Sequence, residues 1–240
     1  MKKISFRKPK VEDDYQIICV FVPFLLGYGV KNTPFVIAIC GGSGSGKSFF
    51  SNVLAKHLTK TLPSYSVQQL SLDRYFFDIA CRSLQENQYV NFDHPDAIDF
   101  GLFASHLVDL KNKGSIYAPK YDFVSHKREN DYDFFSTCDL LIVEGVFLFY
   151  QMEIVDLLDL KLFIETPLEI CLQRRLSRDL KERGRTENGI SCQFKQTVIP
   201  MYKKYIHQTR AHANFLLDGV AAIDENITFT VEQLSQLICD

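Results

Sequence analysis

Short apolar runs recur along this chain, and segments with a helical spacing of apolar positions lie between them. Residues 34–40, 140–143 and 162–164 form continuous apolar runs, which are typical of strands buried on both faces of a parallel sheet. We interpret residues 67–73 and 214–217 as two further strands. The pattern therefore predicts a sheet of about five strands.

Helices are expected between these strands. Segment 47–60 carries apolar residues at a helical period, and segment 97–111 has an apolar face of the same kind. Strands that alternate with helices predict an α/β fold in which right-handed crossovers join the strands of a parallel sheet. Between residues 114 and 130 the pattern changes to short extended pieces, which predicts a β-hairpin inserted beside the sheet.

The bulk composition narrows the classes of function. The 240 residues have a formal net charge of −2 and a pI near 6.3, so we expect no nucleic-acid partner. Seven cysteines are scattered without a Cys-x-x-Cys pair. This spacing favours buried thiols in a reducing cytosol over a disulfide framework or a zinc site.

The first 33 residues precede the first predicted strand. Their apolar run 17–26 contains Pro23 and is shorter than the roughly 20 residues that a membrane-spanning helix needs. We interpret residues 1–33 as an extension of unknown role and residues 34–240 as one domain. We expect a cytoplasmic protein without a membrane partner.

A glycine-rich turn joins the first strand to the first helix. It fits the P-loop pattern G-x-x-x-x-G-K-[ST], in which backbone N–H groups and the positive end of the following helix bind phosphate. Lys47 would reach the β- and γ-phosphates, and Ser48 would ligate Mg²⁺. The predicted nucleotide-binding residues are Gly41, Gly42, Ser43, Gly44, Ser45, Gly46, Lys47 and Ser48.

Two carboxylates are predicted at the carboxyl ends of strands, where open α/β sheets bind their ligands. Asp73 would accept the proton of an attacking hydroxyl, although capping of a helix is an equal alternative for this residue. Glu144 follows four apolar residues and would help to hold Mg²⁺. A carboxylate in such a place is costly without a cation or hydrogen-bond donors.

An arginine-rich segment follows the strand 162–164. Five arginines fall between residues 174 and 185, beside a stripe of leucines spaced four apart, which predicts an amphipathic helix that breaks at Gly184. One interpretation is a solvated face with Asp179 and Glu182 as ion-pair partners. The other is a lid, residues 174–192, that excludes water and whose arginines bind the transferring phosphate.

Four further strings carry a family resemblance. They are NFDHPDA at 91–97, YDFVSH at 121–126, VEG at 143–145 with Phe149 and Tyr150, and residues 175–185 with their Glu-Arg-Gly-Arg ending. With these strings the chain resembles the uridine–cytidine kinases, a group of P-loop nucleoside kinases, from about residue 35 to residue 219. The resemblance implies Mg²⁺-dependent transfer of the γ-phosphate of ATP, or of GTP as an alternative donor, to the 5′-hydroxyl of uridine or cytidine. It implies pyrimidine salvage, and by analogy a homo-oligomer.

The resemblance also implies roles for single residues. Asp73 is similar to the catalytic base of the family, Ser48 and Glu144 to its Mg²⁺ ligands, and Arg178 and Arg183 to lid arginines on the phosphates. Residues similar to nucleoside contacts are Asp93, Arg175, Tyr121, Phe123, His126, Arg185 and Gln193. Asp93 is implied at the ribose hydroxyls, and Tyr121 and His126 at the pyrimidine. The alternatives are a helix cap for Asp93 and a surface position for His126.

The chain departs from the family at several positions. Phe76 and Phe194 stand where the family usually has Tyr, and residues 186–192 differ from its usual run. Residues 220–222 are Val-Ala-Ala where the family carries an Asp near the adenine. These departures keep open a nucleotide-binding regulator with weak turnover. A kinase with another acceptor, like phosphoribulokinase or pantothenate kinase, is a further alternative, which the string 121–126 disfavours.

Overall fold

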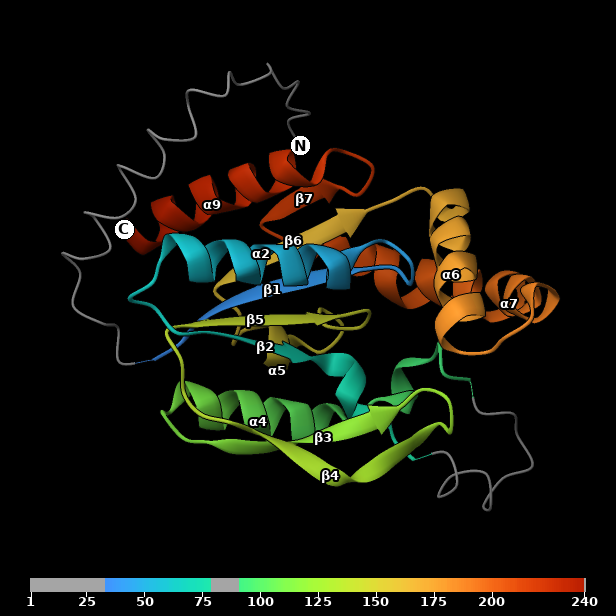
Figure 1. Cartoon of the computed structure of the whole chain (residues 1–240), viewed down its shortest axis with the longest axis horizontal. Coiled ribbons are helices and arrows are strands. Elements are labelled where there is room, and N and C mark those ends of the chain that lie inside the picture. The colour runs from blue at the N-terminus through green and yellow to red at the C-terminus, as the bar shows by residue number, and fades with distance from the viewer. Residues whose placement is uncertain (1–32, 79–90, 240) are drawn as a thin grey trace.

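A parallel five-stranded sheet forms the centre of the computed structural model, which describes residues 33–78 and 91–239. The strand order is β2-β5-β1-β6-β7 (Figure 1). The strands are β1 Phe35–Gly41, β2 Val67–Ser71, β5 Leu140–Gly145, β6 Leu160–Glu165 and β7 Phe215–Asp218. This architecture confirms the predicted α/β fold. Strand β2 ends two residues before Asp73, because Leu72–Tyr75 turns into a 3₁₀ helix, η1.

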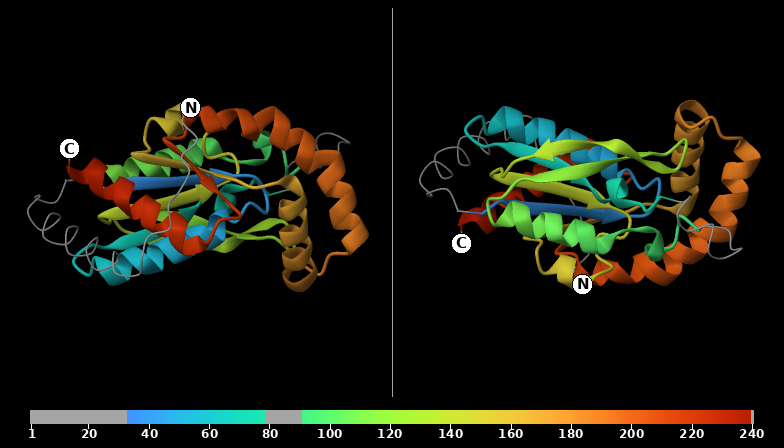
Figure 2. Two further views of the ribbon diagram at one scale, coloured as in Figure 1. Left: turned by 90° about the horizontal axis from the view of Figure 1, so that it is seen from above. Right: turned by 90° about the horizontal axis from the view of Figure 1, so that it is seen from below.

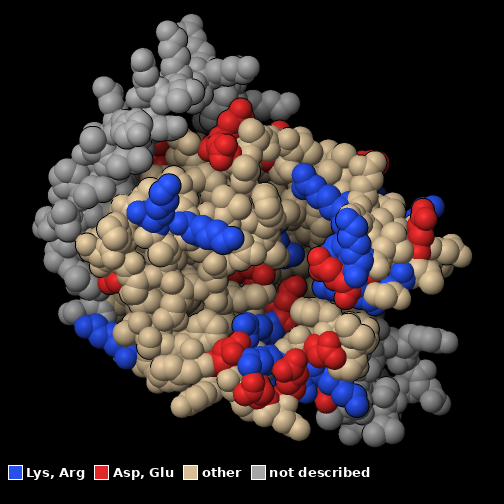
Figure 3. Space-filling view, in the orientation of Figure 1, with Lys and Arg blue, Asp and Glu red and all other residues tan. Residues whose placement is uncertain are grey.

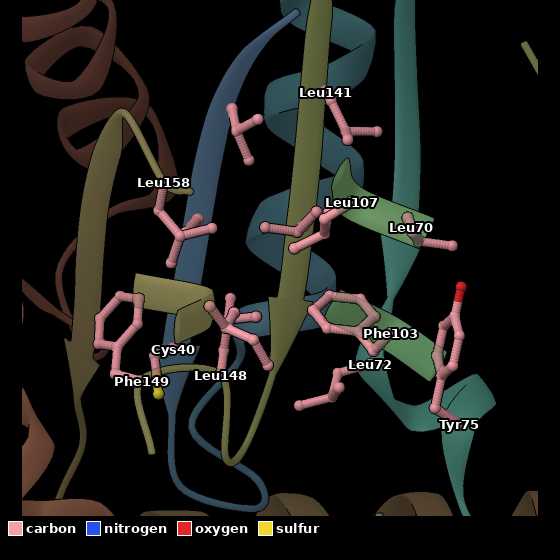
Figure 4. Close-up of a cluster of buried hydrophobic side chains, with 14 of the residues drawn as sticks. Cys40, Leu70, Leu72, Tyr75, Phe103, Leu107, Leu141, Leu148, Phe149 and Leu158 are labelled. Carbon is pink, nitrogen blue, oxygen red and sulfur yellow. The ribbon is translucent and has the colours of Figure 1, made fainter. Parts of the chain in front are cut away.

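Helices cover both faces of the sheet (Figure 2). Helices α2 (Lys47–Thr61) and α9 (Ile223–Cys239) cover one face, where they pack on Ile37 and Ile39 of β1. Helix α4 (Phe100–Lys111) covers the other face (Figure 4). Because alternate residues of β1 enter opposite cores, this strand has the continuous apolar sequence of a strand buried on both faces.

The predicted hairpin is present and is longer than expected. It consists of β3 (Ile116–Asp122) and β4 (Lys127–Phe135), so it ends at Phe135 and not near residue 130. Arg128 of β4 donates hydrogen bonds to the carbonyl oxygens of Phe76 (2.8 Å) and Tyr75 (3.0 Å). The hairpin is thereby fixed to the segment that follows Asp73.

The arginine-rich segment forms helix α6 (Leu168–Glu182), which continues through a turn into α7 (Glu187–Gln193). Both helices project beyond the carboxyl ends of the strands (Figure 1). The predicted leucine stripe is only partly confirmed: Leu168 and Leu172 pack against the apolar cluster that contains Cys171, whereas Leu180 is 45% exposed. The buried residues of α6 are Cys171, Arg175 and Asp179, so ion pairs follow the apolar contacts along this helix.

A run of short helical turns leads from α7 back to the sheet. Its elements are η3 Phe194–Val198, α8 Ile199–Met201, η4 Tyr202–Ile206 and η5 His207–His212. A separate short helix, α5 (Met152–Val155), follows β5.

In the described part of the chain, no helix has the length and apolar character to cross a membrane. Residues 1–32, with the apolar run 17–26, lie outside the described residues. Cys40, Cys138 and Cys171 are buried as expected, whereas Cys192 is exposed.

Candidate active site

The glycine-rich turn lies between the end of β1 and the start of α2, as its pattern predicts. Gly44 and Gly46 have φ values of +81° and +101°, a left-handed region that favours glycine. A Cβ atom on Gly44 would lie 2.3 Å from the carbonyl oxygen of Cys171. The loop therefore needs glycine here both for its backbone angle and for its contact with the first turn of α6.

Glu144 lies beside this loop, because β5 pairs directly with β1. Its carboxylate accepts hydrogen bonds from Ser48 Oγ (3.1 Å) and Ser71 Oγ (2.6 Å). Lys47 Nζ lies 4.0 Å from the same carboxylate. Burial raises the pKa of Glu144 above its ordinary value of 4.5, the charge of Lys47 opposes this rise, and the charge of Asp73 adds to it. Its negative charge is thus only partly compensated.

These groups fit a magnesium ion. Mg²⁺ is usually bound through one or two carboxylates together with waters and substrate phosphates, and not by a cage of protein ligands. Within residues 33–78 and 91–239 no group of three or more His, Cys, Asp or Glu side chains could hold a metal. The Ser48 hydroxyl and the Glu144 carboxylate are two oxygen ligands, a small set of protein ligands of the kind that Mg²⁺ uses.

Asp73 lies in the 3₁₀ turn after β2. Its backbone N–H donates to Ser71 Oγ at 3.2 Å, so Ser71 caps this turn and the capping alternative for Asp73 is wrong. The Asp73 side chain lines the same cavity as Lys47. Its charge also acts on the ionisation of Glu144 and Arg183. Asp73, Lys47 and Arg183 therefore line one space.

A cavity of about 450 Å³ opens beyond the strand ends. It is lined by all the residues that were predicted to contact an acceptor or the transferred phosphate, namely Lys47, Asp73, Asp93, Tyr121, Phe123, His126, Arg175, Arg178, Arg183, Arg185 and Gln193. Phe92, Thr197 and Tyr202 line it too and were not predicted. Around α6 and the hairpin, basic and acidic side chains lie side by side (Figure 3).

One end of the cavity is aromatic. The side chain of Tyr121 is buried, and its hydroxyl has no hydrogen-bond partner among the described residues. Burial raises the pKa of Tyr121 to about 12, so the hydroxyl keeps its proton and can donate to a ligand. The Phe76 ring lies 5.4 Å from the Tyr121 ring, and Phe92 stacks on His126 at 4.5 Å. These rings, together with the Tyr121 hydroxyl and the His126 imidazole, line an aromatic slot at this end of the cavity.

His126 lies in the turn of the hairpin, where it has a φ of +57°. It is exposed, as the surface alternative expects, and it also lines the cavity and stacks on Phe92. Burial lowers its pKa below the ordinary 6.5, and the positive charges of Arg183 and Arg185 lower it further. The imidazole is therefore neutral at pH 7 and can accept or donate one hydrogen bond.

Asp93 also lines the cavity. Its Oδ2 accepts hydrogen bonds from Thr197 Oγ1 (2.6 Å) and Gln193 Nε2 (2.9 Å). The cap of the following 3₁₀ helix is His94, so the capping alternative for Asp93 is wrong. Arg175 donates to Gln193 Oε1 (3.0 Å) and to Ser43 Oγ of the phosphate loop (3.1 Å). A continuous polar chain thus joins the phosphate loop to Asp93.

Asp179 gathers the arginines of this region. Its side chain is fully buried, and Arg178 binds it through Nε (2.8 Å) and Nη2 (2.7 Å). Three further arginines lie within 4 Å of it: Arg175 at 3.4 Å, Arg185 at 3.4 Å and Arg183 at 3.7 Å. The expected pairing with Asp179 is present, but as a buried cluster and not as a solvated face. Four guanidinium groups around one carboxylate leave positive charge facing the cavity.

Comparisons with known proteins agree with this architecture. The model of the "Phosphoribulokinase / Uridine kinase family" matches residues 36–224. A uridine kinase of Leuconostoc citreum is 38% identical over 195 residues, covering 80% of this chain and 92% of that protein. A uridine kinase of Haemophilus ducreyi is 35% identical over 203 residues, covering 85% of this chain and 94% of that protein.

Solved structures share the fold. The D-glycerate 3-kinase of Cryptococcus neoformans superposes with a TM-score of 0.62 at 14% identity, covering 87% of this chain and 95% of that one. At this identity the likeness concerns the fold alone. The family match spans most of the chain and includes the phosphate loop, Asp73, Glu144 and the arginine helix. This chain therefore belongs to the phosphoribulokinase and uridine kinase family.

Proposed function

We propose that this protein transfers the γ-phosphate of ATP to the 5′-hydroxyl of uridine or cytidine. The observation that carries the proposal is a single cavity with Lys47 and Asp73 at one place and an aromatic slot with an unpartnered tyrosine hydroxyl at another. A phosphate donor on the loop and a pyrimidine in the slot would bring a sugar hydroxyl toward Asp73. The relatives named above are themselves uridine kinases.

In the proposed reaction Asp73 takes the proton of the 5′-hydroxyl. The oxygen then forms a bond to the γ-phosphorus, the bond from that phosphorus to the β–γ bridging oxygen breaks, and ADP leaves. Lys47, Arg178 and Arg183 would neutralise the charge on the transferring group. Ser48 and Glu144 would hold Mg²⁺, which supplies further neutralisation of the phosphate oxygens when it is bound. Helices α6 and α7 would keep water away from the γ-phosphate.

Base selection would follow from the slot. The protonated Tyr121 hydroxyl and the neutral His126 imidazole offer hydrogen bonds to one edge of a pyrimidine, and Phe123 and Phe76 would pack beside the ring. We expect these groups to admit a one-ring base and to exclude a larger two-ring purine. Asp93 would bind the ribose hydroxyls, with Arg175, Gln193 and Arg185 beside it.

The test is ADP formation with Mg²⁺ and ATP or GTP, measured for a panel of acceptors. Turnover is expected with uridine and cytidine, and little with adenosine or guanosine. Ribulose 5-phosphate and pantothenate belong in the panel, because turnover with either would support the other kinases of this group. ADP release that does not depend on any acceptor would contradict the proposal. Lys47→Ala should abolish turnover, whereas Lys56→Ala, which changes an exposed lysine of the same helix, should not.

A further inference from the structure

Thr197 lies on the helical run that follows α7, lines the cavity and is hydrogen-bonded directly to Asp93. Its Oγ1 is 2.6 Å from Asp93 Oδ2 and 3.0 Å from the carbonyl oxygen of Gln193. A hydroxyl has one proton to donate. The 2.6 Å contact is within the range of charge-assisted O–H···O⁻ bonds, so the hydroxyl donates its hydrogen bond to the carboxylate of Asp93.

Gln193 fixes the same oxygen from a second side. Its Nε2 donates to Asp93 Oδ2 at 2.9 Å, and its Oε1 accepts from Arg175 Nη2 at 3.0 Å. Arginine can only donate and an ionised carboxylate can only accept, so these two partners determine the orientation of the amide. Oδ2 of Asp93 is therefore fully engaged by the segment that carries Gln193 and Thr197.

The second oxygen of Asp93 is left for a ligand. The charged group nearest to Oδ1 in the described part of the chain is Arg175 Nη1, at 3.8 Å, which is too long for a hydrogen bond. The Asp93 side chain is 14% exposed and lines the cavity. With Oδ2 held, the carboxylate cannot rotate to exchange its two oxygens without breaking two hydrogen bonds.

We propose that Thr197 is a positioning residue that makes efficient turnover depend on a ribose hydroxyl of the acceptor. Its hydroxyl holds Oδ2 of Asp93 in a hydrogen bond within the protein. This leaves Oδ1 directed toward the sugar of the acceptor. The inference rests on the proposed function, since it needs a nucleoside in the cavity. It adds a residue that selects ribonucleosides over deoxyribonucleosides by holding Asp93 in place.

The test combines a change in the protein with a change in the substrate. Thr197→Val keeps the shape of the side chain and removes the hydroxyl, and uridine is compared with 2′-deoxyuridine and 3′-deoxyuridine. In the variant, kcat/KM for uridine should fall about tenfold, the effect of one lost hydrogen bond to a charged group. For the analogue that lacks the hydroxyl bound by Asp93, kcat/KM should fall less than about threefold, because that bond is already absent. KM for ATP should stay unchanged, and Thr197→Ser should restore the preference for uridine.

Thr209→Val is the matched control. Thr209 is on the same helical run, and its hydroxyl donates to the carbonyl oxygen of Ile206 at 2.7 Å, away from Asp93. An equal loss with uridine and both deoxynucleosides in Thr197→Val would show a merely structural role and overturn the inference, as would no loss at all. If the valine variant does not fold, Thr197→Ala is used for the same comparison. A wild-type protein that phosphorylates no nucleoside rejects the proposed function itself, which is a different outcome from a variant that keeps the uridine preference.

Discussion

The Ser48 hydroxyl donates a hydrogen bond to Glu144 Oε2 across 3.1 Å, so the phosphate loop and the end of β5 meet at one buried carboxylate. The contact follows from sheet order, because β5 is the neighbour of β1 and Ile39 is in register with Glu144. Ser71, from the other neighbour of β5, completes the arrangement with a 2.6 Å hydrogen bond. Three adjacent strands therefore place their carboxyl ends around the proposed metal position.

Glu144→Gln should weaken the response to magnesium. The substitution keeps the size of the side chain and removes the charge, so the Mg²⁺ concentration for half-maximal ADP formation should rise about tenfold or more. The matched control is Glu153→Gln, which changes an exposed glutamate of α5. A Mg²⁺ dependence identical to that of the wild type would remove Glu144 from the metal site.

Asp73→Asn should act on the chemical step. Loss of a general base costs about 100- to 10,000-fold in rate, so kcat should fall in this range while nucleoside binding, measured by calorimetry, changes little. Asp156→Asn, a change at an exposed aspartate far from the cavity, should leave kcat unaltered. If kcat of the Asp73 variant barely moves, another group takes the proton.

His126 should contribute to nucleoside binding in its neutral form. Burial and the two neighbouring arginines lower its pKa from 6.5, so protonation occurs below that pH and the neutral ring is present above it. The contribution of His126 to KM for uridine should therefore stay constant from pH 6.5 to about pH 8. KM should rise only when the pH falls below 6.5 and the ring becomes protonated. His126→Ala should raise this KM about tenfold with KM for ATP unchanged.

Lys127→Ala is the control for His126, because Lys127 is the next residue of the hairpin and is exposed. A His126 variant with the kinetics of the wild type would leave this residue without a role in the slot.

Asp179→Asn should destabilise the arginine helix. The carboxylate is fully buried among four guanidinium groups, and removal of one partner from a buried ion pair costs about 3 kcal/mol or more in the free energy of unfolding. Urea unfolding measures this loss, and kcat should fall with it because the arginines lose their common anchor. Glu182→Gln, on the same helix but exposed, should change stability by less than about 0.5 kcal/mol. Equal effects of the two substitutions would contradict the role given to Asp179.

The fold could be predicted where a pattern is local. The apolar run of β1 and the period of α2 were placed within one residue, because each depends only on neighbouring positions. The ends of β2 and of the hairpin were misplaced, because Ser71 capping and the cross-strand pairs up to Phe135 determine them. The leucine stripe of α6 was only partly confirmed, because Leu168 and Leu172 pack in an apolar cluster whereas Leu180, near the end of the helix, is exposed.

The site shows the same division. The P-loop pattern alone located the phosphate loop, whereas the expected nucleoside contacts came from the family strings and not from spacing. Thr197 was missed because its partner, Asp93, is 104 positions away in the sequence, and no local pattern links a threonine to a distant carboxylate. Phe92 was missed as a lining residue although it lies within the string NFDHPDA, beside Asp93.

The close approach of Gly44 to Cys171 has a mechanical consequence. With only 2.3 Å between the position of a Cβ on Gly44 and the Cys171 carbonyl oxygen, the main chains of the phosphate loop and of the first turn of α6 touch directly. These two segments cannot come closer together, and a larger residue at position 44 would need a shift of the main chain. A substitution of Gly44 would therefore displace the first turn of α6 together with the phosphate loop.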